Sequence, residues 1–104
     1  GPYMFDPETF NTVICINMLE HTKHPQKIIE NAFKILNSGG KLLLSVPFRA
    51  DIHDFPNDYW RFTDQGLRLL CEEAGFKTEE LEVYYPGEDG TKDRIYYKGV
   101  FTKP

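Results

Sequence analysis

The 104-residue sequence lacks the features that mark several classes of protein. It has only two cysteines, Cys15 and Cys71, both inside apolar segments, so we expect reduced core residues rather than a disulfide framework or a zinc site. Twelve basic residues against sixteen acidic ones give a net charge of -4 without a basic run, which argues against a nucleic-acid partner. Since no apolar run approaches the roughly 18 residues of a membrane span, and no signal pattern opens the chain, we expect a cytoplasmic protein without a membrane span.

What the sequence does contain is ordinary globular composition, with 40% hydrophobic and 27% charged residues, which predicts a single domain. Residues 12–19 are apolar at successive positions and rich in β-branched side chains, which predicts a parallel strand covered on both faces. Residues 25–37 have apolar side chains at helical spacing before Gly39 and Gly40, and therefore predict an amphipathic helix. A second buried strand over residues 42–46 would complete a right-handed strand–helix–strand crossover.

The second half of the chain predicts one more helix and a hairpin. Thr63 suits a helix N-cap and Gly75 a helix stop, so a helix is expected over residues 64–74. Strand-like runs over residues 77–85 and 94–101 are expected to pair as an antiparallel hairpin. The sequence thus predicts an α/β fold: a mixed sheet of two parallel strands plus the antiparallel hairpin, with helices.

Three blocks of sequence, in this order and spacing, resemble the C-terminal half of the class I S-adenosylmethionine-dependent methyltransferases, in the type 11 branch of ubiquinone and menaquinone biosynthesis enzymes. They are N-T-V-I-C-I-N-M-L-E-H (Asn11–His21), K-I-L-N-S-G-G-K-L-L-L-S-V-P (Lys34–Pro47) and H-D-F-P-N-D-Y-W-R-F-T (His53–Thr63), the last followed by Gly66-Leu67 and Ala74-Gly75-Phe76. The resemblance implies a partial Rossmann-like methyltransferase fold in which residues 1–104 supply strands four to seven of the family. Because the family's last strand lies antiparallel between the two before it, the resemblance also implies the spatial order first, second, fourth, third. It also implies S-adenosylmethionine as cofactor and methyl transfer to an acceptor that the sequence does not name.

The chain departs from the family at the cofactor loop. No G-x-G occurs, and the glycine pairs that are present do not follow a strand and open a helix as a nucleotide-binding loop must. We therefore expect the second half of an enzyme, inactive alone and with weak or absent cofactor binding. An uncovered first strand also predicts a homodimer, formed through that strand or through the sheet face. The alternative is a non-catalytic dimerising or partner-binding module that kept only the sheet.

Candidate site residues come from the two predicted carboxyl ends of the parallel strands. The resemblance implies cofactor contacts from Ile16, Asn17, Met18 and Leu19, against the alternative of a plain strand-to-helix turn. An aromatic-rich segment after the second strand would face the same crevice and bind a small-molecule or glycan-type acceptor. Its candidate substrate-binding residues are Phe48, Arg49, Asp58, Tyr59 and Arg61, whereas Trp60 and Phe62 favour a structural role.

The three histidines suggest base catalysis rather than metal binding. A hydroxyl or carbon acceptor must lose a proton, and His53 or His21 would be the natural base near neutral pH, whereas an amine acceptor needs less help. His21, His24 and His53 have no acidic or cysteine ligand at recognisable spacing to complete a metal set, so we expect no metal site.

Overall fold

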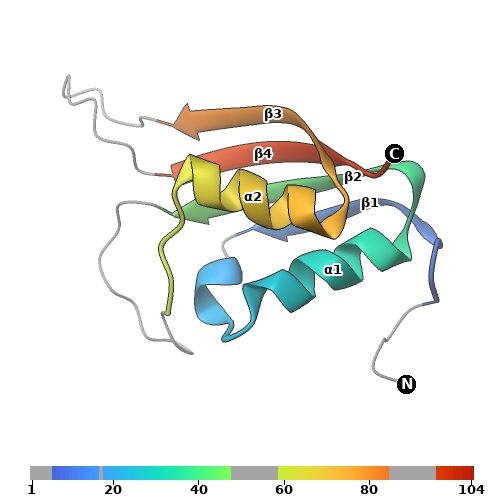
Figure 1. The fold of residues 1–104 in the computed structure, drawn as a ribbon, viewed down its shortest axis with the longest axis horizontal. Coiled ribbons are helices and arrows are strands. Elements are labelled where there is room, and N and C mark those ends of the chain that lie inside the picture. Colours follow the sequence, from blue (N-terminus) through green and yellow to red (C-terminus); the bar gives the residue numbers. More distant parts are fainter. Residues whose placement is uncertain (1–5, 17, 48–58, 85–95) are drawn as a thin grey trace.

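The computed structural model describes residues 6–16, 18–47, 59–84 and 96–104, which form one layer of strands and two helices (Figure 1). In chain order the elements are β1 (Phe10–Ile16), the 3-10 turn η1 (Leu19–His21), α1 (Pro25–Ile35), β2 (Leu36–Pro47), α2 (Asp64–Ala74), β3 (Lys77–Tyr84) and β4 (Tyr96–Thr102). Neither of the two described helices is long and apolar enough to cross a bilayer.

The sheet has the strand order that the sequence predicts. Its four strands lie in the order β1-β2-β4-β3, with β1 and β2 parallel and the other two pairs antiparallel. Leu42 at the centre of β2 lies opposite Val13 of β1 and Phe101 of β4, so β2 lies between β1 and β4 and joins the parallel pair to the antiparallel part of the sheet. This confirms the α/β class and the mixed sheet, and it places β1 and β3 at the two borders of the described sheet.

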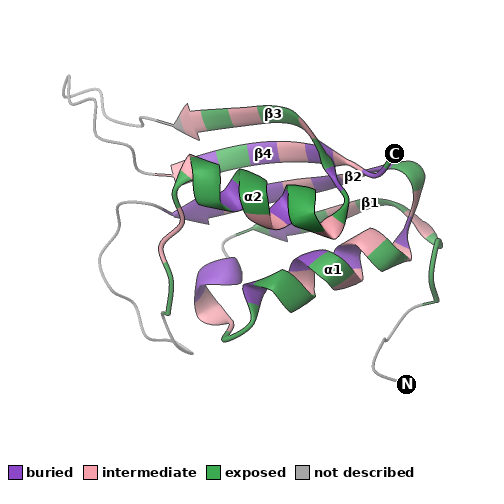
Figure 2. Cartoon of the chain, viewed as in Figure 1, coloured by how far each residue is buried: buried purple, intermediate pink, exposed green. Residues whose placement is uncertain are grey.

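The two described helices cover only one face of this sheet (Figures 1 and 2). Side chains alternate between the faces of a strand, so neighbouring residues report on opposite faces. On β1, Cys15 on the helix side is 4% exposed, whereas Ile14 and Ile16 on the other side are 61% and 59% exposed. Among the described residues, nothing covers the face from which Ile14 and Ile16 project.

Two predicted boundaries were wrong. The first strand ends at Ile16, and Leu19–His21 form the 3-10 turn instead of continuing the strand to residue 19. The first helix ends at Ile35, and the glycines expected to stop it lie in β2. The cause is tertiary: Gly39 N–H donates to the carbonyl of Lys103 (2.6 Å) and Lys103 N–H donates to the carbonyl of Gly40 (2.9 Å), so the end of the chain extends β2.

Helix α2 has the predicted bounds because its ends carry local signals. The Thr63 hydroxyl accepts a hydrogen bond from the Gly66 N–H at 3.0 Å, which satisfies one of the free donors of the first turn. Gly75 ends the helix at φ +114°, and a Cβ there would lie 2.8 Å from the Phe33 ring. Glycine is thus required at this position by both backbone conformation and space.

The core lies between the two helices and the sheet. Its fully buried side chains include Ile29 of α1, Leu67 of α2, Leu42 of β2 and Phe101 of β4. Both cysteines are free and buried, as predicted, and burial raises the pKa of Cys15 to about 11 and that of Cys71 to about 12. The thiols therefore pack as small apolar groups at neutral pH.

Candidate functional site

The candidate site is the edge of the sheet where the parallel strands β1 and β2 both end. In an open α/β sheet, ligands bind outside the carboxyl ends of such strands. After β1 the chain makes the η1 turn, closed by the His21 N–H, which donates to the carbonyl of Met18 at 3.0 Å. Met18 is 54% exposed at this edge, whereas Leu19 and Glu20 are fully buried. The apolar side chain of Met18 is therefore exposed at this edge, whereas those of Leu19 and Glu20 are buried and fix the turn to the rest of the domain.

The segment that enters α2 is hydrogen-bonded to this turn (Figure 1). The backbone N–H groups of Tyr59 and Trp60 donate to the carbonyl of Glu20 at 2.7 and 3.3 Å, and the Trp60 indole Nε1–H donates to the carbonyl of Thr22 at 2.7 Å. The rings of Tyr59 and Trp60 remain 43% and 44% exposed. Part of the predicted acceptor segment thus lies against the turn that carries the predicted cofactor contacts.

Glu20 and His21 form a carboxylate–imidazole pair at the same edge. The Nε2 atom of His21 lies 3.6 Å from Oε2 of Glu20, whose side chain is 1% exposed, while that of His21 is 18% exposed. At 3.6 Å the contact is longer than a hydrogen bond, so the carboxylate acts on the imidazole by charge and not by a directed bond. The sequence analysis did not predict that Glu20 is buried. The only indication in the sequence is that this acidic residue directly follows an apolar run.

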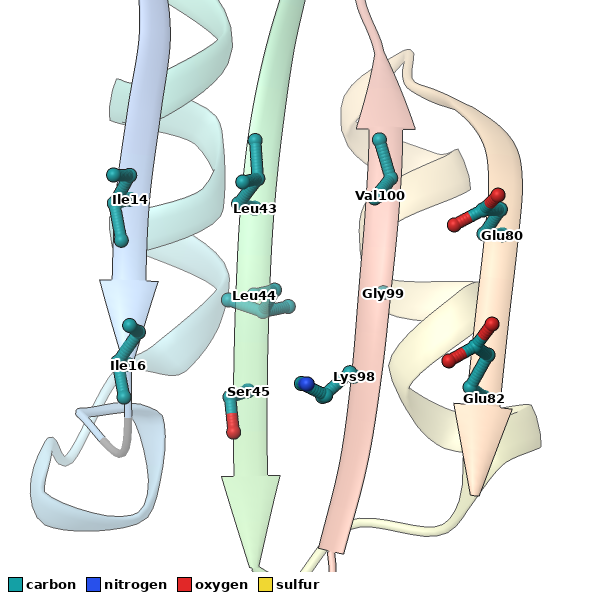
Figure 3. A pocket seen from close by; sticks show the side chains of 10 residues that line it. All are labelled: Ile14, Ile16, Leu43, Leu44, Ser45, Glu80, Glu82, Lys98, Gly99 and Val100. Atoms are coloured by element: carbon teal, nitrogen blue, oxygen red, sulfur yellow. The ribbon is translucent and has the colours of Figure 1, made fainter. Parts of the chain in front are cut away.

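The other predicted site residues divide into three groups. The Leu19 side chain is fully buried in the core, so only its backbone is available for a ligand. Ile16 projects from the face of the sheet opposite the helices, beside η1 (Figure 3), and Arg61 donates from Nη1 to the carbonyl of Trp60 at 2.9 Å. Asn17, Phe48, Arg49, His53 and Asp58 lie outside the described residues.

The two aromatic residues expected to be structural differ from each other. Phe62 packs against the hydrophobic core, as a structural role requires. Trp60 is nearly half exposed and is anchored by its indole nitrogen instead of by burial. Within the parts of the chain that the structure describes, no group of three or more metal-ligating side chains occurs.

Taken together, the sheet order and the ligand edge define a Rossmann-like fold of the methyltransferase class. The family model described as a methyltransferase domain matches residues 4–81. The chain therefore belongs to the methyltransferase domain family, whose cofactor is S-adenosylmethionine. This confirms the resemblance that the three sequence blocks carry.

Individual relatives and one solved structure agree with this assignment. A tRNA U34 carboxymethyltransferase of Sulfurovum sp. is 30% identical over 89 residues, which are 74% of this chain and 29% of the relative. A ubiquinone biosynthesis O-methyltransferase of Xanthomonas euvesicatoria is 49% identical over 40 residues, 38% of this chain and 17% of the relative. An S-adenosylmethionine-dependent methyltransferase of Mesorhizobium loti has the same fold, with a TM-score of 0.76 at 10% identity over 92% of this chain and 62% of its own. The chain thus spans less than a third of these curated relatives.

Proposed function

We propose that this chain acts in S-adenosylmethionine-dependent methyl transfer, as part of a complete enzyme, and that it supplies the edge of the sheet where the acceptor meets the cofactor. The observation that carries the proposal is the hydrogen bonding of Tyr59 and Trp60 to the η1 turn at the end of β1. These bonds hold Tyr59 and Trp60, both partly exposed, against the turn that follows the exposed residue Met18. Aromatic and apolar groups with a few fixed polar ones are typical of small-molecule sites.

In our proposal the described residues line one side of the cofactor. Met18 and Ile16 offer exposed apolar surface at the end of β1, and the turn offers backbone groups. We propose Ile16, Asn17, Met18 and Leu19 as the cofactor contacts of this chain. The glycine-rich loop and the acidic ribose ligand of the family have no counterpart in the sequence, so in our proposal residues 1–104 are the C-terminal half of the domain, inactive alone, and the remaining cofactor contacts come from elsewhere in the enzyme.

In this proposal the residues of the site align the acceptor with the cofactor and remove a proton from the acceptor. S-adenosylmethionine supplies a methyl group that is already activated, so the protein mainly orients the acceptor for in-line displacement. For a hydroxyl or carbon acceptor we propose His21 as the base, with the Glu20 carboxylate 3.6 Å from its Nε2 atom, and His53 as the second candidate. The acceptor contacts that we propose are Phe48, Arg49, Asp58, Tyr59 and Arg61.

We propose a small-molecule or glycan-type acceptor. The net charge of -4 and the lack of a basic run favour this class over RNA. The Xanthomonas relative is named for a small-molecule pathway, and the Sulfurovum relative for a tRNA, so RNA is the opposing candidate. Two free thiols agree with a cytoplasmic location.

Calorimetric titration of S-adenosylhomocysteine tests the proposal. The 104-residue chain should bind weakly or not at all, and a polypeptide extended upstream into the rest of the enzyme should bind in the micromolar range. Met18→Glu in the extended polypeptide should weaken binding, whereas the matched change Leu69→Glu, at a 59% exposed leucine on α2, should not. Equal binding by the short and extended chains would contradict the half-domain proposal.

Kinetics of the extended enzyme test the role of His21. With a hydroxyl or carbon acceptor, His21→Gln should lower kcat by about 10²- to 10⁴-fold with little change in the KM for S-adenosylmethionine, because only the proton transfer is lost. His24→Gln is the matched control, since His24 is an exposed histidine in the same loop. Equal activity of the two variants would exclude His21 as the base.

A second candidate function, a non-catalytic module that forms a homodimer through β1, is favoured by one observation. β1 is a border strand of the described sheet, and its seven residues include no charged residue and no proline, the usual guards of an exposed edge. A dimer by light scattering that persists in the extended polypeptide without cofactor binding would support this candidate. A monomer at micromolar concentration would remove it.

A further inference from the structure

The only tryptophan of the sequence, Trp60, lies at the candidate site and is fixed there while much of it stays open to solvent. Its indole Nε1–H donates to the carbonyl of Thr22 at 2.7 Å, and its backbone N–H donates to the carbonyl of Glu20 at 3.3 Å. The residue is nevertheless 44% exposed. An exposed aromatic side chain that is already held in place loses little freedom when a ligand binds to it. The charges around Trp60 therefore decide which ligands it favours.

Positive charge reaches Trp60 from two separate segments of the chain. Lys23 directly follows Thr22, so its Cα lies at most about 7 Å from the indole nitrogen, and the residue is exposed. Arg61 directly follows Trp60, and its Nη1 atom donates to the carbonyl of Trp60 at 2.9 Å. A lysine ammonium moves on a flexible stem, and a guanidinium is always charged. The fold thus brings two cationic residues to one aromatic side chain in a protein of net charge -4.

The described carboxylates at this edge are not exposed. The Glu20 side chain is 1% exposed, and its Oε2 atom lies 3.6 Å from Nε2 of His21. Asp64 is half-buried in the first turn of α2, where the helix dipole favours an acidic residue. A ligand that approaches Trp60 from solvent therefore meets the cations of Lys23 and Arg61 more directly than these carboxylates.

This arrangement selects ligands by charge. An aromatic ring by itself attracts a cation, but a cationic ligand at Trp60 would be repelled by Lys23 and Arg61. A carboxylate or phosphate would instead accept charge-assisted hydrogen bonds, which are roughly twice as strong as neutral ones. A nucleic acid gains its affinity from many phosphate contacts along its backbone, whereas two cations suit one anionic group.

We propose that the methyl acceptor of this enzyme is a small molecule with an anionic oxygen group, a carboxylate or a phosphate, which binds beside Trp60 and contacts Lys23 and Arg61. This inference narrows the acceptor class and rests on the part of the proposed function that places the acceptor at this edge.

The fluorescence of Trp60 tests the local charge directly, because the sequence has no other tryptophan. Iodide and caesium ions quench indole fluorescence on contact, and the net charge of -4 alone would favour caesium. At constant ionic strength, the ratio of the iodide to the caesium quenching constant should be at least about twofold higher for the 104-residue chain than for free N-acetyltryptophanamide.

A pair of double variants assigns this effect to the two residues. Lys23→Gln/Arg61→Gln should lower the ratio to that of N-acetyltryptophanamide or below it. Lys34→Gln/Lys77→Gln removes the same charge from the last turn of α1 and the start of β3, at the opposite edge of the sheet, and should leave the ratio unchanged. Circular dichroism checks that both variants are folded, and the measurement on the wild-type chain does not depend on them.

Binding of small probes tests the ligand class. The indole N–H resonance of Trp60 is followed while benzoate, phenyl phosphate, neutral benzamide or cationic benzylamine is added to the 104-residue chain. The two anions should bind about tenfold or more tightly than benzylamine, and Lys23→Gln/Arg61→Gln should reduce their affinity to that of benzamide. The difference between benzoate and phenyl phosphate shows which anionic group is preferred. A uridine oligonucleotide should bind no more tightly than phenyl phosphate.

Three results would overturn the inference: a quenching ratio equal to that of the free compound, no preference for the anionic probes or no binding of any probe, and tighter binding of the oligonucleotide. None of these measurements involves S-adenosylhomocysteine. An extended enzyme that binds S-adenosylhomocysteine while the chain shows no anion preference would refute this inference alone. Anion binding at Trp60 without any binding of S-adenosylhomocysteine by the extended enzyme would instead refute the proposed function.

Discussion

Replacement of Lys103 by methionine is expected to destabilise the fold strongly, although this lysine is next to the last residue of the sequence. Its side chain is 10% exposed, and its ammonium group donates to the carbonyls of Phe33 and Leu36, both at 2.9 Å. The ammonium also lies 4.6 Å from the centroid of the Phe33 ring. Lys103 thereby caps the C-terminus of α1, where carbonyl groups have no partner within the helix and the helix dipole favours a cation.

The magnitude follows from these contacts. A hydrogen bond from a charged donor contributes about 1.5–3 kcal/mol, and methionine keeps the apolar stem but leaves two carbonyls without the donor. The ion pair with Glu8 adds little, because it is 3.9 Å long and the Glu8 side chain is 68% exposed. We expect Lys103→Met to lower the free energy of unfolding by about 2–4 kcal/mol. In a domain of this size that corresponds to a melting temperature lower by roughly 10–25 °C.

Urea unfolding followed by far-ultraviolet circular dichroism measures this effect. Lys27→Met is the matched control, since Lys27 is an exposed lysine on the same helix, and its replacement should change stability by no more than about 0.5 kcal/mol. Equal unfolding midpoints for the two variants would refute the reasoning that Lys103 caps α1.

Three further predictions concern the core and the site. Gly99→Ala should lower the free energy of unfolding in urea by about 1–3 kcal/mol, because the Cβ of the alanine would lie 2.5 Å from the Phe101 ring. An unchanged free energy of unfolding would show that the ring has room to move. Trp60→Phe should lower the free energy of unfolding by about 1 kcal/mol in the same assay, because it removes the 2.7 Å hydrogen bond from the indole Nε1–H to the carbonyl of Thr22. An unchanged unfolding midpoint would mean that this hydrogen bond does not contribute to stability. Burial raises the pKa of Cys15 to about 11 and that of Cys71 to about 12, so the thiols ionise at lower pH in the unfolded chain than in the folded one. Their contribution to stability should be present below about pH 9 and be lost between about pH 9 and 12. The double variant Cys15→Ala/Cys71→Ala should show a shallower fall, and an identical slope would contradict this assignment.

Much of the fold could be predicted from sequence because its signals are local. Helix α2 is specified by a capping threonine, an apolar stripe and a glycine at positive φ, all within about a dozen residues. The parallel first pair followed from the crossover rule, whereas the place of the last strand between the second and third came from the resemblance to the family. For the site, the sequence predicted a place, the carboxyl ends of the parallel strands, and a set of candidate residues, but not the contacts among them. Which groups meet there, such as the indole of Trp60 and the carbonyl of Thr22, depends on contacts between distant residues.

The sequence by itself determined the order and type of the elements, the family, and the apolar character of β1. Only the tertiary structure decided where β2 begins, because Gly39 and Gly40 pair with the backbone of Lys103 more than sixty residues away. It also decided that β1 has a covered face and an open face. The apolar residues of a strand indicate that it must be buried. They do not indicate which of its faces another element covers, because that depends on the side of the sheet on which the helices pack.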